Sequence, residues 1–164
     1  MKSLIALIGI LATVAVAQQP NPDQGFYVQA AQGGMAEVEL GKLAQTNGGS
    51  AAVKEFGTQM VTDHGKANTR LKAIAARKQV VLPSTLSPEH QAMKKKLEGL
   101  SGAAFDTEYL AGQVADHEKV AALLEQEAAA GKDPDAKAFA TDTLPTVKAH
   151  LEMARKLSHG GKHE

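Results

Sequence analysis

Cysteine is absent from the 164-residue sequence. Its absence excludes disulfide bonds, thiolate metal ligands, cysteine nucleophiles and a lipid anchor on an N-terminal cysteine. Tryptophan is absent too, and aromatic residues make up only 4% of the chain, too few for a surface that stacks nucleic-acid bases. The formal net charge is zero, so bulk charge gives no reason to expect a nucleic-acid partner. No phosphate loop and no nucleophile turn is recognisable, so we predict no catalytic residues and favour an enzyme least.

A long apolar run occurs only near the N-terminus. Lys2 precedes a mostly apolar stretch over 4–16, which is too short to cross a bilayer as a mature helix. The stretch ends in Ala15-Val16-Ala17, a small-residue pattern typical of signal-peptide cleavage. We therefore predict a signal peptide over 1–17 and an exported protein, periplasmic or secreted, with no transmembrane segment in the mature chain. The alternative is that the apolar stretch is retained as an anchor.

The rest of the chain is rich in helix-forming sequence, with Ala, Leu, Val and Met available for the core. After a flexible leader over 18–25, helical periodicity and stop signals predict long helices over 26–46, 51–78, 103–130 and 134–158, and a short helix over 88–98. Similar residues follow two Gly-containing loops, at 52–57 and 135–140, which indicates two related helical hairpins. We predict an all-α, ferritin-like four-helix bundle over 26–158, whose hairpins are joined by a long crossover carrying the short helix, and a disordered tail over 159–164.

Three of the long helices have a histidine within their apolar stripe. These residues are His64, His117 and His150, each at a position that should face the bundle interior. Neutral imidazoles are good ligands for Zn, Cu, Fe and Ni, so three converging histidines predict a metal site. The alternative is a buried cluster in which the rings are satisfied by hydrogen bonds alone.

Acidic residues accompany the histidines. Glu37 lies on the small-residue face of helix 26–46 and is the fourth candidate ligand, whereas Glu39 should point to solvent. Asp63 and Asp116 each precede a histidine by one residue. Each either pairs with the lysine three residues further on or accepts a hydrogen bond from a histidine on another helix and so orients it.

The histidine spacing argues against a standard di-iron centre. Such centres use Glu-x-x-His on two helices, because that spacing places both ligands on one face. The residues three positions before the histidines are Val61, Val114 and Val147, which cannot bind a metal. We therefore expect at most a single transition-metal ion, with Zn, Cu and Fe as the candidates.

Three further features suggest local structure. The Gly33-Gly34 pair favours close helix packing over a hinge. Pro145 predicts a kink or a break within helix 134–158. The run Lys94-Lys95-Lys96 is most simply a solvated face, with an anionic partner site as the alternative.

Several separate motifs resemble one known family. They are Phe26 with Gly33-Gly34-Met35-Ala36-Glu37-Val38-Glu39-Leu40-Gly41, then Met60-Val61-x-Asp63-His64-x-Lys66-Ala67-Asn68, Gly102-Ala103-Ala104-Phe105-Asp106 with Tyr109, Asp116-His117-Glu118-Lys119, and Leu144-Pro145 with His150. Together they resemble the bacterial family called domain of unknown function 4142, over about 26–157. The resemblance implies a ferritin-like bundle in an exported protein, often described as periplasmic or outer-membrane, without an established activity. The family motifs fall on Glu37, Asp63, His64, Asn68, His117 and His150.

The leading functional hypothesis is an exported metal-binding or stress-related binding protein. Its candidate ligands are Glu37, His64, His117 and His150, and its candidate supporting residues are Asp63, Asn68 and Asp116. The competing hypothesis is a structural or interaction module of the cell envelope, in which the same residues form a buried hydrogen-bonded cluster. An envelope partner or a second copy of the chain is compatible with both hypotheses.

Overall fold

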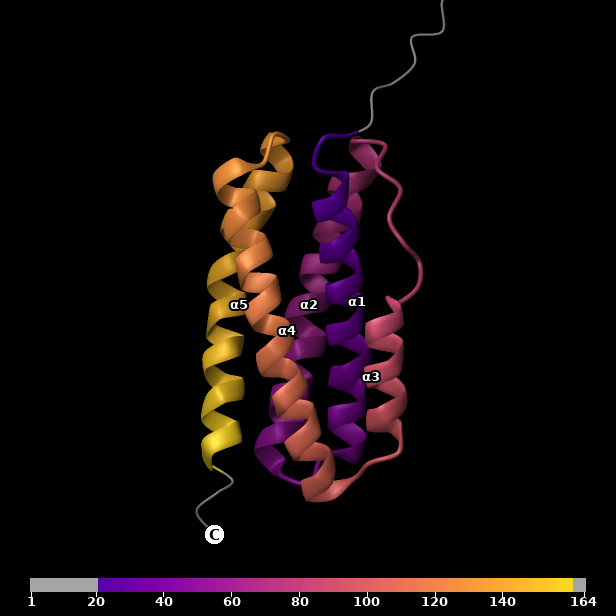
Figure 1. Ribbon diagram of the computed structural model, residues 1–164, viewed down its shortest axis with the longest axis vertical. Helices are drawn as coiled ribbons and strands as arrows, with labels where there is room; N and C mark the ends of the chain where they lie inside the picture. Colours follow the sequence, from indigo (N-terminus) through magenta and orange to yellow (C-terminus); the bar gives the residue numbers. More distant parts are fainter. Residues whose placement is uncertain (1–20, 161–164) are drawn as a thin grey trace, which may run out of the picture.

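The structure is a computed structural model that describes residues 21–160. It contains helices α1 (Gln24–Asn47), α2 (Ala51–Arg77), α3 (Pro88–Glu98), α4 (Gly102–Ala130) and α5 (Pro134–Gly160) (Figure 1). The predicted signal peptide with its cleavage site, the first part of the leader and the end of the tail lie outside the described residues. Within 21–160, no helix is long and apolar enough to cross a membrane.

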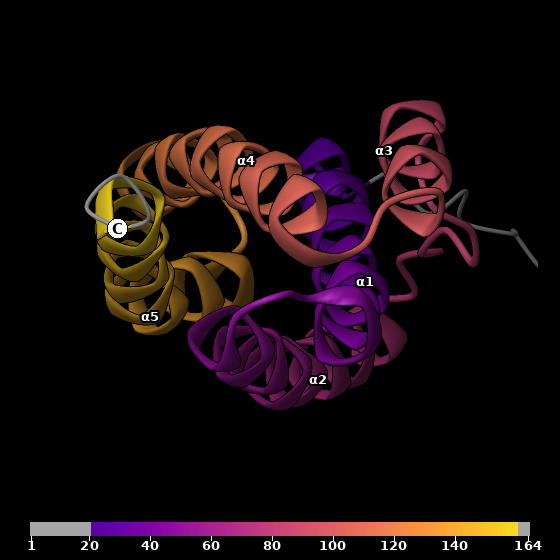
Figure 2. The same cartoon turned by 90° about the horizontal axis from the view of Figure 1, so that it is seen from below.

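The four long helices form a closed bundle. Helix α1 packs along α2 and α4 along α5, while α1 also adjoins α4 and α2 adjoins α5 (Figure 2). Each of these neighbouring pairs is antiparallel (Figure 1). The crossover from α2 to α4 runs outside the bundle and carries α3, which packs against α1 and α4. The predicted all-α, ferritin-like arrangement of two hairpins with a helix-bearing crossover is therefore confirmed.

Polar caps fix where several of these helices begin. The side chains of Ser50 and Ser87 each accept a hydrogen bond, 3.2 Å long, from the backbone N–H three residues further on. At the start of α5, Asp133 Oδ1 accepts from the backbone N–H of Asp135 at 3.0 Å. Ser101 precedes α4 but makes no capping bond. Because these signals are local, the helix starts follow closely from the sequence.

Close packing holds α1 against α2. A Cβ atom on Gly34 would overlap the side-chain amide of Asn68, so the close packing predicted for the Gly33-Gly34 pair is found at Gly34. Further down, a Cβ on Gly41 would lie 2.8 Å from the Gly57 carbonyl oxygen, and one on Gly57 would lie 2.7 Å from the Gly41 carbonyl oxygen. The two backbones thus approach too closely for any side chain at these positions.

Pro145 does not interrupt α5. Proline cannot donate the backbone hydrogen bond that a helix interior normally supplies, yet the helix runs from Pro134 to Gly160 without a break. The break that the sequence allowed at this position is therefore absent. The continuous helix places Val147 and His150 in the interior.

The interior consists of two apolar clusters separated by a polar layer. The upper cluster, at the top of Figure 1, comprises Phe26, Tyr27, Ala31, Leu71, Ile74, Ala75, Val80, Ala121, Leu124, Ala136, Phe139, Ala140 and Val147. The lower cluster comprises Leu40, Ala44, Val53, Phe56, Met60, Leu97, Phe105, Tyr109, Leu110 and Ala154. Between them in every long helix lies the polar layer, defined as the buried residues Glu37, His64, Gln113, His117 and His150. The bundle therefore carries its buried histidines at mid-height.

Candidate metal centre

Three histidines from three helices meet in the polar layer. His64 comes from α2, His117 from α4 and His150 from α5, and their exposed fractions are 8%, 1% and 1%. Their ring centroids are 5.6 Å apart for His64 and His117, 5.3 Å for His64 and His150, and 5.5 Å for His117 and His150. One ring nitrogen of each lies within 4.8 Å of the others. The predicted convergence of the histidines is therefore confirmed.

Hydrogen bonds at the outer ring nitrogens orient two of the histidines. His117 Nδ1 lies 3.0 Å from the backbone oxygen of Gln113, and His150 Nε2 lies 3.2 Å from Asp63 Oδ2. A carbonyl or carboxylate oxygen only accepts, so each of these nitrogens donates. In the neutral ring the opposite nitrogen then carries a lone pair, which is the form that binds a metal.

One nitrogen of each histidine ring has no hydrogen-bond partner among the described residues. His64 Nε2, His117 Nε2 and His150 Nδ1 are buried and make no hydrogen bond. Gln113 Oε1, in the same layer, is also buried without a partner. An unsatisfied buried polar atom costs about 1–3 kcal/mol, so three such ring nitrogens in one layer are unusual for a purely structural cluster. Three imidazole lone pairs in a site with no thiolate fit a transition-metal ion such as zinc or copper.

Burial keeps the histidines neutral. It lowers the pKa of His64 to about 3, with further lowering from the charges of His117 and His150. Burial also lowers the pKa of His117 and of His150, against the opposing effects of the Gln113 carbonyl on the first and Asp63 on the second. At neutral pH all three rings therefore have a nitrogen lone pair available.

Glu37 lies near Nδ1 of His117, whereas the unpartnered nitrogen of that ring is Nε2. Its exposed fraction is 3%, its Oε2 accepts a 2.6 Å hydrogen bond from Gln113 Nε2, and its Oε1 lies 3.6 Å from His117 Nδ1. It is not part of the group whose donor atoms lie within 4.8 Å of one another. Burial raises the pKa of Glu37 to about 8, although the hydrogen bond from Gln113 opposes this. The structure brings Glu37 to a histidine of the site, but to its outer nitrogen.

The two aspartates reach different partners. Asp63 contacts His150, on another helix, and lies 4.0 Å from the Lys66 ammonium. Asp116 lies 3.7 Å from His90 Nε2 and 3.8 Å from the Lys119 ammonium. Asp63 is thus placed to orient a histidine of the cluster, whereas Asp116 faces a histidine outside it.

A cavity of about 30 Å³ adjoins the cluster. His64 and His117 line it, together with Glu37 and Asn68. A space of this size accommodates about one water molecule or a single ion. Asn68 therefore lies at the edge of the histidine site, against Gly34.

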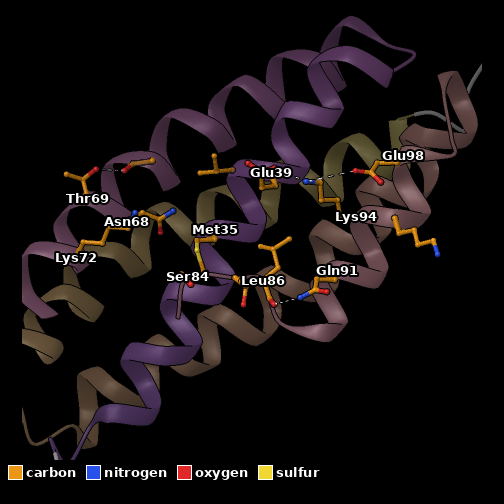
Figure 3. A pocket seen from close by; sticks show the side chains of 14 residues that line it. Met35, Glu39, Asn68, Thr69, Lys72, Ser84, Leu86, Gln91, Lys94 and Glu98 are labelled. Carbon is orange, nitrogen blue, oxygen red and sulfur yellow. Dashed lines mark hydrogen bonds and ion pairs between the residues drawn. The ribbon is translucent and has the colours of Figure 1, made fainter. Parts of the chain in front are cut away.

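A larger surface pocket lies elsewhere. It has a volume of about 840 Å³ and is formed by α1, α2, the crossover and α3 (Figure 3). Glu39 and Lys94 form a 2.9 Å ion pair in its wall, and no histidine lines it. Lys96 of the same lysine run pairs with Glu108.

Two contributors to the polar layer and its surroundings were not assigned from the sequence. The side chain of Gln113 donates to Glu37, and its backbone oxygen accepts from His117 Nδ1. In the sequence, Gln113 is distinguished only as a polar residue within the apolar stripe of α4. His90 has no such signal, because its position depends on how the crossover places α3. Both residues are defined by contacts across helices.

The fold and the site together define a helical-bundle protein with a three-histidine cluster in its core. The chain belongs to the family described as Domain of unknown function (DUF4142), whose model matches residues 11–157. Among curated proteins there is no match.

Solved structures of other proteins share the fold at low sequence identity. "CopM in the Cu(II)-bound form" has a TM-score of 0.71 and 12% identity, covering 84% of this chain and 96% of that chain. CopM in the Ag-bound form has a TM-score of 0.69 and 11% identity, covering 87% and 98% respectively. A DUF305 fragment from Deinococcus radiodurans has a TM-score of 0.74 and 14% identity, covering 86% and 99%. At these identities the likeness shows a common helical fold.

Proposed function

We propose that this protein is an exported binding protein that holds a single transition-metal ion through His64, His117 and His150. The observation that carries the proposal is the set of three buried ring nitrogens, one per histidine, that have no hydrogen-bond partner. The three rings come from three helices, and in His117 and His150 the opposite ring nitrogen donates to Gln113 and Asp63. A metal ion would satisfy all three at once.

The separations favour an ion over direct contacts between the rings. The three unpartnered ring nitrogens make no hydrogen bonds to one another, although one nitrogen of each ring lies within 4.8 Å of the others. Donors bound to one ion at 2.0–2.2 Å lie roughly 3–4 Å apart, so small side-chain rotations would close the site. Imidazole ligands suit zinc, copper, iron and nickel. Copper is the first ion to test, because CopM shares the fold and is described with Cu(II) and Ag bound.

The neighbouring carboxyl groups would act through the histidines. Asp63 accepts from His150, and Glu37 lies against the outer nitrogen of His117. Such outer partners fix the tautomer and orientation of a ligating ring and increase its basicity. In this assignment Glu37, Asp63 and Asn68 support the site, and the ligand set contains histidines only.

Export is supported by the N-terminal sequence pattern. The basic residue, apolar stretch and Ala-x-Ala pattern over 1–17 are those of a signal peptide. A DUF305 protein from Streptomyces coelicolor, which shares the fold with a TM-score of 0.70 and 14% identity, is named as a candidate secreted protein. The ion would then be bound outside the cytoplasm.

The test is the metal content of protein purified from its native compartment. We expect one equivalent of metal per chain in the wild type and a loss of at least about tenfold in His64→Ala and in His117→Ala, since each removes one of three donors. His159→Ala is the matched control, because His159 is exposed at the end of α5. Circular dichroism at 222 nm verifies that each variant folds. Unchanged metal content in both site variants would contradict the ligand assignment.

The alternative function is a structural or interaction module of the envelope. It is favoured by the contacts that the polar layer makes without an ion, namely Gln113 to Glu37 at 2.6 Å and His150 to Asp63 at 3.2 Å. Metal-free wild-type protein that binds neither added Cu²⁺ nor added Zn²⁺ would establish this alternative over metal binding.

A further inference from the structure

A surface pocket adjoins the small cavity beside the histidines. The pocket has a volume of about 210 Å³ and is lined by residues of α1, α3 and α4. It shares four lining residues with the 30 Å³ cavity, namely Gly33, Glu37, Val120 and Leu123. Gly33 contributes no side chain, and a Cβ there would already meet Val120 at 3.7 Å. A thin wall that includes Glu37 therefore separates the surface pocket from the histidine site.

The pocket contains a histidine and a carboxylate at metal-ligand spacing. His90 Nε2 and Asp116 Oδ2 are 3.7 Å apart, with side-chain exposed fractions of 16% and 14%. This is too long for a hydrogen bond but lies within the roughly 3–4 Å that separates two donors on one ion. The outer nitrogen of His90 lies 2.9 Å from Ser87 Oγ. A hydroxyl both donates and accepts, so Ser87 accommodates the tautomer that leaves Nε2 free for a cation.

The charges around the pair leave room for a cation. Glu89 also lines the pocket, and the Lys119 ammonium lies 2.6 Å from Glu89 and 3.8 Å from Asp116. One ammonium group thus faces two carboxylates, and the local charge remains negative. Two protein donors leave most of an ion's coordination to water, so a site of this kind exchanges its ion more readily than three buried imidazoles do.

We infer that His90 and Asp116 form an outer cation site that captures the metal ion and passes it, across the wall at Glu37, to the inner histidines. This inference rests on the proposed function of those histidines. Two other routes have less support in the structure. The 840 Å³ pocket shares only Asn68 with the inner cavity. Asp63, whose side chain is 29% exposed, reaches His150 but lines neither the inner cavity nor the 840 Å³ and 210 Å³ pockets.

The test is the rate at which metal-free protein takes up Cu²⁺. The chain has two tyrosines and no tryptophan, so quenching of tyrosine fluorescence by Cu²⁺ in a stopped-flow instrument follows binding. We expect His90→Ala and Asp116→Asn each to slow uptake at least about fivefold, because they remove a donor or a charge that concentrates the cation. The final stoichiometry should stay at that of the wild type. Asp116→Asn preserves the shape of the side chain, so it tests the charge without disturbing packing.

Two variants serve as matched controls. His159→Ala removes an exposed histidine remote from the pocket, and Glu39→Gln removes a carboxylate from the wall of the 840 Å³ pocket. Both should take up Cu²⁺ within about twofold of the wild-type rate. Wild-type rates in His90→Ala and Asp116→Asn, or slowing confined to Glu39→Gln, would overturn the outer site while leaving the histidine centre intact. A wild type that binds neither Cu²⁺ nor Zn²⁺ would instead refute the proposed function itself, and the outer site with it.

Discussion

Individual ionisable residues in the polar layer have opposing effects on stability. Histidines with depressed pKa values stabilise the fold most above pH 6.5, and this contribution is lost as the pH falls towards the pKa of about 3 for His64. The contribution of Glu37 to stability changes with pH in the opposite direction. Its folded pKa of about 8 exceeds the ordinary 4.5, so its contribution is complete below pH 4.5 and is lost as the pH rises through 8. The metal-free protein should therefore lose stability in both directions from near neutrality.

The variant Glu37→Gln tests the loss of stability above neutral pH. Glutamine still offers an oxygen to Gln113, which donates to Glu37 at 2.6 Å, but it cannot ionise. We expect the free energy of unfolding of the wild type to fall by about 1 kcal/mol between pH 7.5 and 9, and that of Glu37→Gln to stay level. Urea denaturation at the two pH values measures the difference.

Glu127 provides the control for this measurement. It is buried in the upper part of α4, and burial raises its pKa to about 7. The stability that Glu127 contributes is therefore almost fully lost by pH 7.5. Glu127→Gln should retain the alkaline slope of the wild type, and a slope that disappears in Glu127→Gln but persists in Glu37→Gln would refute the assignment to Glu37.

At the level of elements, the contact between α1 and α2 depends on two glycines. A Cβ on Gly57 would lie 2.7 Å from both the Gly41 carbonyl oxygen and the Ala44 Cβ. Gly57→Ala should therefore force the helices apart and destabilise the protein by about 1–3 kcal/mol. Gly65 is on the same helix with no neighbour within 4 Å of its Cβ position. Gly65→Ala should stabilise by about 0.5–1 kcal/mol, because alanine is the better helix former.

Urea midpoints for the two glycine variants give the comparison directly. The opposite signs at Gly57 and Gly65 separate helix contact from intrinsic helix propensity. Stabilisation by Gly57→Ala would show that the two backbones do not approach as closely as the structure describes.

The sequence predicted the elements well because their boundaries depend on local chemistry. Serine caps, glycine stops and Pro134 define helix ends within a few residues, so α2 differs from its predicted range only at its last residue. The ends of α1 and α5 extend slightly further, to Gln24 and Gly160. From the sequence, Pro145 was compatible with either a kink or a break in α5. Which of the two occurs depends on how α5 packs in the bundle, and the sequence does not show this.

Across the whole molecule, the candidate centre connects the two hairpins. His64 belongs to the α1–α2 hairpin, whereas His117 and His150 belong to the α4–α5 hairpin. An ion held by all three binds only the assembled bundle, so it stabilises the folded state as a whole. At a free Cu²⁺ concentration of 100 times Kd, the gain should be about 2.7 kcal/mol, which corresponds to a rise in Tm on the order of 10 °C.

Thermal denaturation with and without Cu²⁺ checks this expectation. His117→Ala should show no rise in Tm, and His159→Ala should show the full rise. An equal rise in His117→Ala would mean that Cu²⁺ stabilises the protein at some other place.

The sequence predicted only part of the candidate site. The apolar stripes were sufficient to predict that His64, His117 and His150 face the interior, since the period of a helix determines which residues share a face. They could not show on which side of His117 the Glu37 carboxylate lies, because that depends on the rotation of α1 against α4. The pairing of Asp116 with His90 depends on where a long crossover places a short helix, and no local pattern determines that.

The polar layer also has a consequence for how the hairpins align. Apolar helices built from Ala, Leu and Val can slide past one another by one turn, about 5.4 Å, with little change in buried area. Here such a slip would move the histidines into one of the two apolar clusters and separate His150 from Asp63 and Gln113 from Glu37. The polar layer thus favours one alignment of the two hairpins along the bundle axis, whether or not an ion is bound.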